Sequence, residues 1–502
     1  MSNNALQHNN EIRNIIIVGG GTAGWMAANL LQHHLAEHGF NCTLIESPDI
    51  PTIGVGEGST PQLKNFFTTL GLSESQWMPA CQATYKVGIQ FNNWSSQANN
   101  SHYFHPFPSI VDKHTARVFL QQCIAKQQGR MAEAHPDRYF LAAQLAKQGL
   151  SPKVKQPPAL GLNYAYHFDS ALLGQYLQKI ALKQGIDYLQ GKVVGINKHP
   201  NNDISEVVLE DGRQVGGELF IDCSGFQGLL IDKLLGNTFV NYNNQLFNDK
   251  AIALPSEKLQ PLASQTQATA LNNGWAWQIP LTNRTGNGYV YASHYCNADK
   301  AETELRRHLG MLNHANEAKH LSMKVGRLAQ HWKHNCLAVG LSQGFIEPLE
   351  ATALHLVQHT VESFVGAFLA GNFSSQHQVQ FNQRINNRFD GIKDYIVAHY
   401  KINNRNDSLY WQDNRENDDI SASLRALLDC WDKGGNLIEE INQQQIAAYY
   451  PIVSWFCLLA GYGRFSQAGP TAMVDHTQLT GMDGTLQSLS LLFKDHQQAL
   501  TF

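Results

Sequence analysis

Few of the features that mark nucleic-acid-binding, membrane or metal-binding proteins occur in this chain of 502 residues. Charged residues make up only 16% of it and its formal net charge is −4, so it lacks the basic surface that phosphate backbones require. The most apolar stretch near its N-terminus, residues 14–31, is interrupted by glycines and is too short to cross a bilayer. We therefore expect a protein that binds neither nucleic acid nor membrane.

The eight cysteines are scattered, and no two of them have the C-x-x-C spacing of a zinc or redox site. This distribution favours reduced thiols over disulfide bonds. Residues 1–13 contain neither a basic stretch nor an apolar core, so we expect no signal peptide and a cytoplasmic location. His355 and His359 are four residues apart but lack a third ligand in their motif, and we expect no metal site.

The order of apolar runs predicts an α/β protein. A β-branched run at residues 12–18 ends in glycines, a helical pattern follows from Ala23 to about Leu35, and a second strand begins at Cys42. Strand, helix and strand in this order open a βαβ unit. Further buried-strand patterns occur at residues 217–225 and 335–345, and a long amphipathic helix is predicted at residues 350–371. Together they predict a sheet-based nucleotide module interleaved with a mostly helical one.

A glycine-rich turn between the first strand and the first helix predicts a dinucleotide site. Such a turn lets a pyrophosphate approach the helix N-terminus, where free amides and the helix dipole favour anions. Glu46, 22 residues after the last glycine and at the end of the next strand, suits a contact with a ribose hydroxyl. The pattern does not separate FAD from NAD. The turn consists of Gly19, Gly20, Gly21, Thr22, Ala23 and Gly24.

Two further stretches allow more than one interpretation. Residues 50–63, IPTIGVGEGSTPQL, are either a strap over a flat cofactor ring or an ordinary surface loop. In GLSQGFIEPLEATAL (340–354), Pro348 is placed near the start of a helix, so that free amides around Ala351 to Ala353 could hold a small anion. Taken alone, Glu347 and Glu350 are more typical of plain acids at a helix N-terminus.

Lys86 and the pair Trp275 and Trp277 are likewise ambiguous on local grounds. Lys86 alternates with Tyr85 and Val87 along an apolar strand, and such a lysine is more often at the surface than catalytic. In GWAWQIP (274–280), the two tryptophans point to one side of an extended segment that Pro280 ends. A buried core strand is the simplest interpretation.

Taken together, these segments resemble the flavin-dependent tryptophan halogenases. The resemblance covers most of the chain in order, and the combination of W-x-W-x-I-P with P-L-E-A/S-T is highly specific for that family. The segments that carry it are IIIVGGGTAGWMAA (15–28), IPTIGVGEGSTPQL (50–63), YKVGIQF (85–91), YHFD (166–169), FIDCSGFQGLLI (220–231), GWAWQIP (274–280), GFIEPLEATAL (344–354) and HYKINNRNDSLYW (399–411).

The resemblance implies a fold and a cofactor. It implies a Rossmann-like FAD-binding module of the flavin monooxygenase type, formed by residues 1–90, 160–250 and 265–385. The mostly helical aromatic-substrate module would then comprise residues 91–159 and 386–502. FAD contacts around Val193, Leu341 and Leu354 are added to those of the glycine turn and Glu46. The implied partners are a small aromatic substrate and a separate flavin reductase; a homodimer is left open.

The family's reaction assigns roles to the ambiguous residues. Reduced FAD reacts with oxygen to a C4a-hydroperoxide, which oxidises chloride or bromide to hypohalous acid. The halide is held on the amides of Thr352 and Ala353. Lys86 then presents the halogen to an aromatic carbon, either through a hydrogen bond or as a haloamine, and Glu350 stabilises or deprotonates the arenium ion. Trp275 and Trp277 form a barrier between flavin and substrate.

The substrate pocket implied by the resemblance consists of His105, Phe107, Trp275 and Tyr450. Ala351 replaces a serine of the members that act on free tryptophan, and Gln445 stands where those members have a glutamate for the substrate ammonium. Loss of that charge-assisted hydrogen bond should weaken the binding free energy of an amino-acid substrate by about 1.5–3 kcal/mol. We therefore expect an indole-like aromatic substrate. A flavin-dependent aromatic hydroxylase, a non-catalytic FAD-binding relative and an NAD-dependent dehydrogenase are the alternatives.

Overall fold

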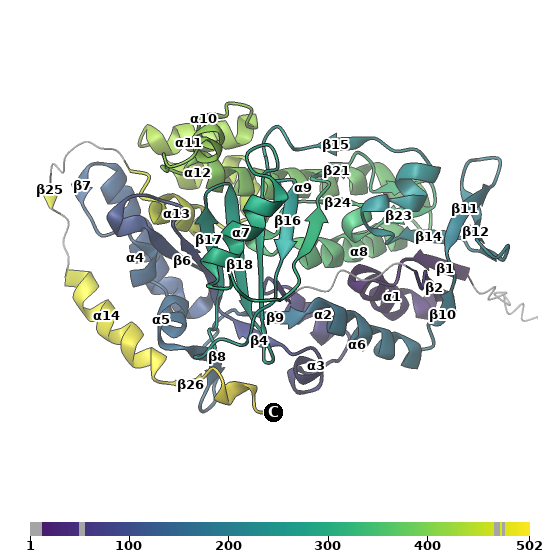
Figure 1. The fold of residues 1–502 in the computed structure, drawn as a ribbon, viewed down its shortest axis with the longest axis horizontal. Helices are drawn as coiled ribbons and strands as arrows, with labels where there is room; N and C mark the ends of the chain where they lie inside the picture. The colour runs from purple at the N-terminus through teal and green to yellow at the C-terminus, as the bar shows by residue number, and fades with distance from the viewer. Residues whose placement is uncertain (1–12, 50–55, 466–471, 474–476) are drawn as a thin grey trace, which may run out of the picture.

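The predicted glycine turn lies at the centre of a six-stranded sheet in a computed structural model, which describes residues 13–49, 56–465, 472–473 and 477–502 (Figure 1). The strand order is β10-β2-β1-β14-β23-β22, and all pairs are parallel except the edge strand β22. This is the predicted Rossmann-like arrangement. The bounds are β1 (Arg13–Val18), β2 (Phe40–Glu46), β10 (Asp187–Gln190), β14 (Leu219–Asp222), β22 (Trp332–Lys333) and β23 (Cys336–Ala338).

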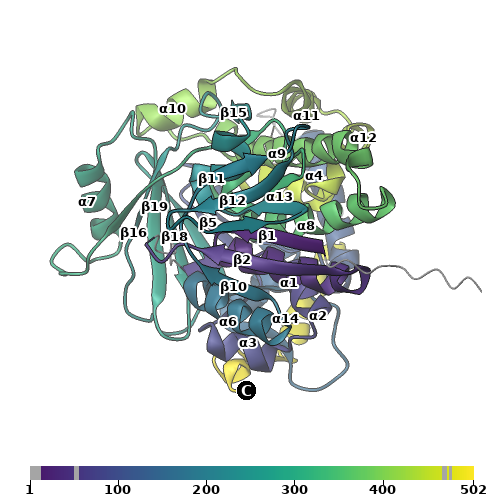
Figure 2. The ribbon, with the colours of Figure 1, turned by 90° about the vertical axis from the view of Figure 1, so that its right-hand side faces the viewer.

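Three helices cover one face of this sheet, and a small antiparallel sheet covers the other (Figure 2). The predicted first helix is α1 (Thr22–Leu35), which packs against α6 (Ser170–Lys183) and α8 (Ala353–Ala370). On the opposite face, Ile16 and Val18 of β1 pack with residues of β12 in a second hydrophobic core. The small sheet consists of β11 (Val193–Lys198), β12 (Ile204–Leu209) and β13 (Gln214–Gly216).

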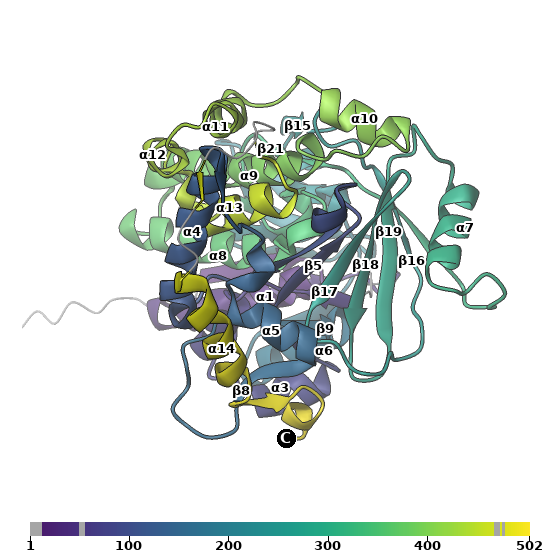
Figure 3. The same ribbon diagram turned by 90° about the vertical axis from the view of Figure 1, so that its left-hand side faces the viewer.

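A seven-stranded sheet forms the second large layer, with the order β20-β16-β19-β18-β17-β5-β6 (Figure 3). Helix α7 (Ala298–His308) lies on one of its faces, where Ala276 and Tyr289 are buried, and helices from the last quarter of the chain approach the other. Its strands are β5 (Gly88–Asn92), β6 (His102–Pro106), β16 (Lys250–Ala253), β17 (Thr266–Leu271), β18 (Gly274–Pro280), β19 (Thr285–Tyr291) and β20 (Lys319–Ser322).

Smaller sheets connect these layers. The sheet that matters most for the site has the order β3-β9-β4. The elements are β3 (Gly56–Gly58), β4 (Thr84–Lys86) and β9 (Ala165–Asp169) in that sheet; β15 (Phe239–Asn241), β21 (Gly326–Leu328) and β24 (Gly344–Phe345) in another; and the pairs β7 (Arg130–Met131) with β25 (Ala472–Met473) and β8 (Leu150–Val154) with β26 (Phe493–Asp495).

Most of the remaining helices lie beside the seven-stranded sheet or above it in Figure 1, whereas α2 packs against α8 and α3 against α6. No helix within the described ranges is long and apolar enough to span a membrane. The predicted division into two modules stays a prediction; β6, from the segment assigned to the helical module, is an edge strand of the large sheet. These helices are α2 (Leu63–Thr69), α3 (Glu74–Ala80), α4 (Lys113–Gln127), α5 (Leu141–Gln148), α9 (Gln378–Lys401), α10 (Leu409–Glu416), α11 (Ala422–Asp432), α12 (Leu437–Gln443), α13 (Ile452–Gly461) and α14 (Thr477–Ser490).

Candidate active site

The glycine turn between β1 and α1 is closed by backbone contacts that only glycine permits. A Cβ on Gly19, whose φ is +118°, would lie 2.2 Å from the carbonyl oxygen of Cys223, and one on Gly24 would lie 1.9 Å from the Gly19 carbonyl oxygen. A Cβ on Gly20 would meet the Glu46 carboxyl at 2.2 Å, whereas Gly21 has no atom within 4 Å of that position. The open side therefore lies at Gly21, the N-cap of α1, where a pyrophosphate fits.

Glu46 and Thr22, two other predicted cofactor residues, lie at the same end of helix α1, and both side chains have hydrogen-bond partners within the protein. Glu46 accepts a hydrogen bond from the Tyr188 hydroxyl at 2.9 Å. The Thr22 hydroxyl donates to the Ser170 carbonyl at 2.9 Å, so its side chain is occupied and only its backbone faces the open side.

A second loop completes this end of the sheet. A Cβ on Gly340 would lie 2.7 Å from the Cβ of Ala23, which places the loop that carries Leu341 beside α1. Leu354 lies buried in the first turn of α8. The side chain of Val193 packs in the second hydrophobic core, which leaves its backbone for a cofactor contact. Of the predicted strap at residues 50–63, residues 50–55 lie outside the described residues, and Gly56–Gly58 form strand β3.

Lys86 is fully buried, contrary to the surface position that its sequence pattern favoured. It ends the short strand β4, and its Nζ donates a hydrogen bond to the Ser59 carbonyl at 3.1 Å and lies 5.6 Å from the centre of the Phe107 ring. Burial lowers the pKa of Lys86 to about 8, and the nearby Glu350 carboxylate opposes this shift. A buried amine of such low basicity is suited to group transfer.

Glu350 lies in a tight turn and not at the start of the long helix, which is a correction to the sequence-based expectation. Pro348–Glu350 form a 3-10 turn, Ala351 has a left-handed φ of +55°, and α8 begins only at Ala353. The reversal at Ala351 separates the carboxylate of Glu350 from the helix axis, so that it points into the buried interior, where only 7% of the residue is exposed.

His399, on α9, holds the Glu350 carboxylate. Its Nε2 lies 3.0 Å from Oε1 of Glu350, and its Nδ1 lies 3.0 Å from the Tyr462 hydroxyl. Burial lowers the pKa of His399 to about 3, so the ring is neutral and donates through Nε2 while Nδ1 accepts. Burial raises the pKa of Glu350, an effect that His105 and Lys86 oppose.

The predicted halide amides at Thr352 and Ala353 are free. Neither backbone N–H has an acceptor among the residues that the structure describes, as expected at a helix N-terminus. The Ala351 amide, in contrast, donates to the Pro348 carbonyl at 3.0 Å, so it does not belong to the set. Two amides at the positive end of an 18-residue helix favour a small anion.

One face of the seven-stranded sheet brings the predicted aromatic residues together. His105 pairs with Ile89, and Phe91, two residues further along β5, is opposite Ala268 of β17. Ala268 in turn faces Trp277 of β18. Because side chains alternate along a strand, the residues at these paired positions share one face. The same face carries His105 of β6 and Trp275 and Trp277 of β18.

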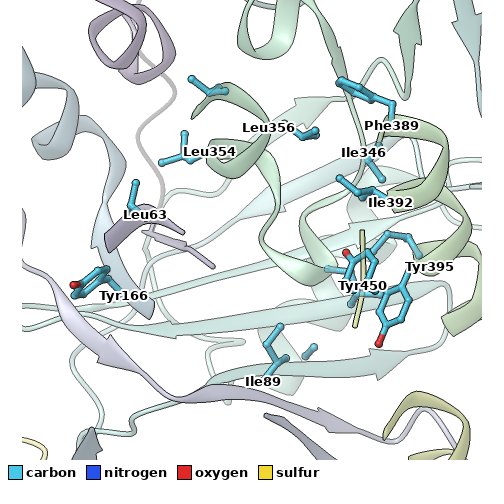
Figure 4. Packing of buried hydrophobic residues seen from close by; sticks show 14 of the residues in the cluster. Leu63, Ile89, Tyr166, Ile346, Leu354, Leu356, Phe389, Ile392, Tyr395 and Tyr450 are labelled. Carbon is cyan, nitrogen blue, oxygen red and sulfur yellow. The ribbon is translucent and has the colours of Figure 1, made fainter. Parts of the chain in front are cut away.

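Tyr450 does not line an open sandwich, because Tyr395 occupies the space beside it. The two rings are stacked with centroids 3.6 Å apart and planes 7° from parallel, and they face Ile89 in Figure 4. The Tyr395 ring lies 6.2 Å from that of His105, between the two predicted walls. The Tyr450 hydroxyl is buried without a hydrogen-bond partner within the described part of the chain. Tyr395 was missed, although it lies four residues before His399 on one helix.

Gln445 does not face the buried aromatic residues. It is exposed and begins a short 3-10 turn with a left-handed φ of +58°. The expectation that Gln445 replaces a buried ammonium ligand is therefore not supported by its position.

The tryptophan pair stands on the central strand β18 as a buried wall. Trp275 and Trp277 are 1% and 8% exposed, and their ring centroids are 6.3 Å apart. The Trp277 indole lies directly over Gly288 of β19, where a Cβ would come within 2.0 Å of the ring. Strand β18 ends at Pro280, as predicted.

Comparison with known proteins decides the family. The family model described as tryptophan halogenase matches residues 14–477. The chain belongs to the tryptophan halogenase family. It is 34% identical to tryptophan 6-halogenase SttH of Streptomyces toxytricini over 89% of each chain, and 30% identical to tryptophan 7-halogenase RebH of Lentzea aerocolonigenes over 94% and 93%.

Solved structures agree with this result. The SttH structure matches with a TM-score of 0.83 at 32% identity and covers 97% of this chain and 99% of its own. BrvH, a flavin-dependent halogenase from Brevundimonas sp. BAL3, matches with a TM-score of 0.82 at 30% identity over 98% and 99%. The protein is therefore a flavin-dependent halogenase with FAD as the cofactor its family implies, and the hydroxylase alternative is the less supported one.

Glu347 is a buried acid of this halogenase that sequence analysis treated as a plain helix acid. Its carboxylate accepts hydrogen bonds from Asn248 Nδ2 at 2.7 Å and from the Tyr400 hydroxyl. Asn248 also donates to the Tyr400 hydroxyl at 2.9 Å and accepts from the Tyr410 hydroxyl at 3.0 Å. This network fixes Glu347, the residue that precedes the Pro348–Glu350 turn. It thereby helps to position the Glu350 carboxylate and the amides of Thr352 and Ala353.

We expect Glu347 to make the stability of the halogenase depend on pH. Burial raises its pKa from 4.5 to about 7, against the opposing hydrogen bonds. Between these two pH values the folded protein keeps a proton that the unfolded chain has lost, so stability falls as pH rises through this window, by roughly 3 kcal/mol from this group. Glu347→Gln should flatten that slope, as measured by urea unfolding from pH 4.5 to 7.5.

The exposed Glu317 offers a matched control, and Glu317→Gln should keep the slope of the parent protein. If Glu347→Gln shows the parent slope as well, Glu347 is ionised throughout and the network is purely structural.

Proposed function

We propose that this halogenase transfers chlorine or bromine from hypohalous acid, by way of Lys86, to an indole-like aromatic substrate. The observation that carries the proposal is the buried pairing of Lys86 and Glu350, two electrostatically coupled groups beside an aromatic sheet face. Among the described residues Lys86 forms no salt bridge, and the Glu350 carboxylate is hydrogen-bonded to the neutral His399. The cost of burying both is offset by their function and not by a structural salt bridge.

The end of the six-stranded sheet that carries the glycine turn would hold FAD and the halide. The glycine turn from Gly19 to Gly24, with Glu46, would hold the pyrophosphate and ribose, and the loop at Leu341 would lie along the ring system. The amides of Thr352 and Ala353 would hold the chloride or bromide. When bound and reduced by a separate reductase, FAD supplies, with oxygen, the oxidation of halide to hypohalous acid. Every other role belongs to side chains of this chain.

Lys86 receives the halogen. Either its Nζ donates a hydrogen bond to hypohalous acid and polarises the O–X bond, or its amine is halogenated with release of water and passes the halogen on. In the first route the ring electron pair attacks the halogen, the O–X bond breaks and the departing hydroxide is protonated to water; in the second the N–X bond breaks and the amine takes up a proton. In both routes C–X replaces an aromatic C–H and the ring proton leaves. A pKa of about 8 gives Lys86 a substantial neutral fraction, which the second route needs.

Glu350 takes part on the ring side. Its carboxylate, oriented by His399, would stabilise the arenium cation and accept the ring proton. His105, Phe107 and the Tyr395 ring that covers Tyr450 would fix the substrate plane, and Trp275 with Trp277 would keep the substrate away from the flavin. SttH and RebH are named as tryptophan halogenases; here the aromatic face and Ala351, in place of a serine, support an indole-like substrate instead of the free amino acid.

The test is a reconstituted reaction with FAD, a flavin reductase, oxygen and an equimolar mixture of chloride and bromide over indole, 3-substituted indoles and free tryptophan. We expect products with the isotope pattern of chlorine or bromine, formed faster from indoles than from tryptophan, as measured by mass spectrometry. Preference for free tryptophan would contradict the substrate assignment, and oxygenated products without halogen would contradict the reaction.

A further inference from the structure

The strand that carries Lys86 has one unpaired edge. Within the described residues, strand β4 pairs with β9 alone, with Tyr85 opposite Tyr166 and Lys86 opposite Ala165. In an antiparallel pair, alternate residues direct their backbone N–H groups away from the partner strand. The N–H of Tyr85 is such a group, and because it is buried it requires an acceptor from elsewhere.

His496, near the C-terminus, supplies that acceptor. The Tyr85 N–H donates to Nε2 of His496 at 3.2 Å, across a separation of 411 residues. The other ring nitrogen, Nδ1, lies 3.1 Å from the Leu262 carbonyl, and since a carbonyl can only accept, Nδ1 carries the proton and Nε2 is free to accept. The side chain is 1% exposed, and burial lowers its pKa to about 4, so the ring stays neutral in this arrangement.

The segment that carries His496 is firmly attached. Residues 491–496, the C-terminal clasp, include β26, which pairs with β8 next to β4 (Figures 1 and 3). The Lys155 N–H donates to the Leu492 carbonyl at 2.8 Å, and the His496 N–H donates to the Gly149 carbonyl at 3.0 Å. Phe493 is 1% exposed and belongs to the main core. The clasp is therefore fixed independently of its contact with β4.

The side chain of Tyr85 is held by different residues from those that hold its backbone. The Tyr85 hydroxyl donates to Glu74 at 3.0 Å, and Glu74 also accepts from Tyr164, Tyr166 and Lys153. Burial would raise the pKa of Glu74, but these hydrogen bonds outweigh it and keep the pKa below its usual value. A surface hollow of about 490 Å³ lies around Glu74 on this side, away from the aromatic site. Tyr85 is thus held through its ring by Glu74 and through its backbone by His496.

We propose that His496 is a positioning residue for halogen transfer, which acts by holding the backbone of Tyr85 and thereby the adjacent Lys86. The inference rests on the proposed role of Lys86. Glu74 restrains the Tyr85 ring, whereas the backbone around Lys86 is held by two contacts, the Tyr85 N–H on His496 and the Val87 N–H on the Ser264 carbonyl at 2.8 Å. Without His496, the N–H of Tyr85 loses its acceptor, and the Lys86 ammonium, whose own hydrogen bond goes to the Ser59 carbonyl, shifts relative to Phe107 and Glu350.

The test compares His496→Ala with His496→Gln in the full-length enzyme, using indole and bromide. Misplacement of a catalytic group by about 1 Å can cost 100-fold in rate. We expect His496→Ala to lower the turnover for brominated product by about 10- to 100-fold with an unchanged KM for bromide and an unchanged rate of reduced-flavin oxidation. His496→Gln, whose Oε1 can accept from Tyr85, should recover most of the activity.

Hydrogen exchange of the peptide that contains Tyr85 provides a readout that does not depend on the reaction. It should accelerate in His496→Ala and return towards normal in His496→Gln. The control is Ser490→Ala, which removes a hydrogen bond between the neighbouring segment and Gln148 without touching β4, and should change neither readout.

The possible results separate the proposal from the role of Lys86. Unchanged hydrogen exchange of the Tyr85 peptide in His496→Ala would show that His496 does not restrain the backbone of β4. Faster exchange with normal product formation would overturn its importance for positioning. Should Lys86 itself prove dispensable for halogenation, the failure lies with the proposed function, and the exchange data would still report the contact.

Discussion

Replacing Lys86 with methionine is expected to lower the yield of halogenated product by about 10²- to 10⁴-fold, the range for loss of a positioned acid or transfer group. Methionine keeps the volume of the buried side chain but has no N–H and no nucleophilic nitrogen. Hypohalous acid is then neither polarised nor captured beside the substrate. Reduced-flavin oxidation should continue at the parent rate, since the glycine turn and the halide amides are untouched.

The measurement is halogenated indole by mass spectrometry, with oxygen uptake recorded in parallel. Lys86→Arg tests the two routes, because a guanidinium retains hydrogen-bond donation but cannot carry a halogen at pH 8. Activity in the arginine variant supports polarisation, and its absence supports the haloamine. The exposed Lys192 is the control, and Lys192→Met should behave as the parent enzyme. A near-normal yield of halogenated indole from Lys86→Met would contradict the proposed role of Lys86 in halogen transfer.

The second large effect is expected from the double variant Trp275→Leu/Trp277→Leu. Leucine preserves an apolar strand but removes both indoles, so the substrate is no longer kept away from the flavin. We expect the ratio of hydrogen peroxide plus hydroxylated product to halogenated product to rise by at least about tenfold, which corresponds to about 1.4 kcal/mol in relative barriers. Peroxide assay and mass spectrometry on the same reaction give this ratio.

An effect of the double variant on the product ratio must be distinguished from its effect on protein stability. Truncation of a buried tryptophan to alanine costs about 3–5 kcal/mol, and the leucine double variant will also unfold at a lower temperature. Trp332 is a matched control, since it is 1% exposed and packs against Phe364 and Phe381 of the α8 and α9 core. Trp332→Leu should lose stability and keep the product ratio. An unchanged ratio in the double variant would make the tryptophan pair an ordinary core strand.

What the sequence predicts well are features carried by neighbouring residues. The strand ending at Val18, the helix through Leu35 and the glycines between them follow from local periodicity and from sterics at single positions. The side of β18 on which Trp275 and Trp277 lie also follows from alternation alone. Lys86 and Glu350 were identified through the motifs around them, because their own positions gave no local signal.

What it did not predict depends on contacts between distant segments. The burial of Lys86 arises where β4 meets β9 and the Ser59 carbonyl, and nothing in residues 84–88 reports that neighbourhood. The turn at Ala351 contradicts the local helix pattern because the left-handed conformation is stabilised by its surroundings and not by the alanine. Tyr395, which fills the space beside Tyr450, lies 55 residues earlier in the chain, on α9.

The long-range contact between Tyr85 and His496 has a consequence for synthesis of the enzyme. Domains form progressively as the chain leaves the ribosome, N-terminal parts first. The dinucleotide turn and the lysine strand emerge early, whereas the acceptor for the Tyr85 N–H is translated 411 residues later. A nascent chain would therefore contain the lysine strand β4 before it contains the acceptor for the Tyr85 N–H, so the proposed position of Lys86 is completed only by a late segment.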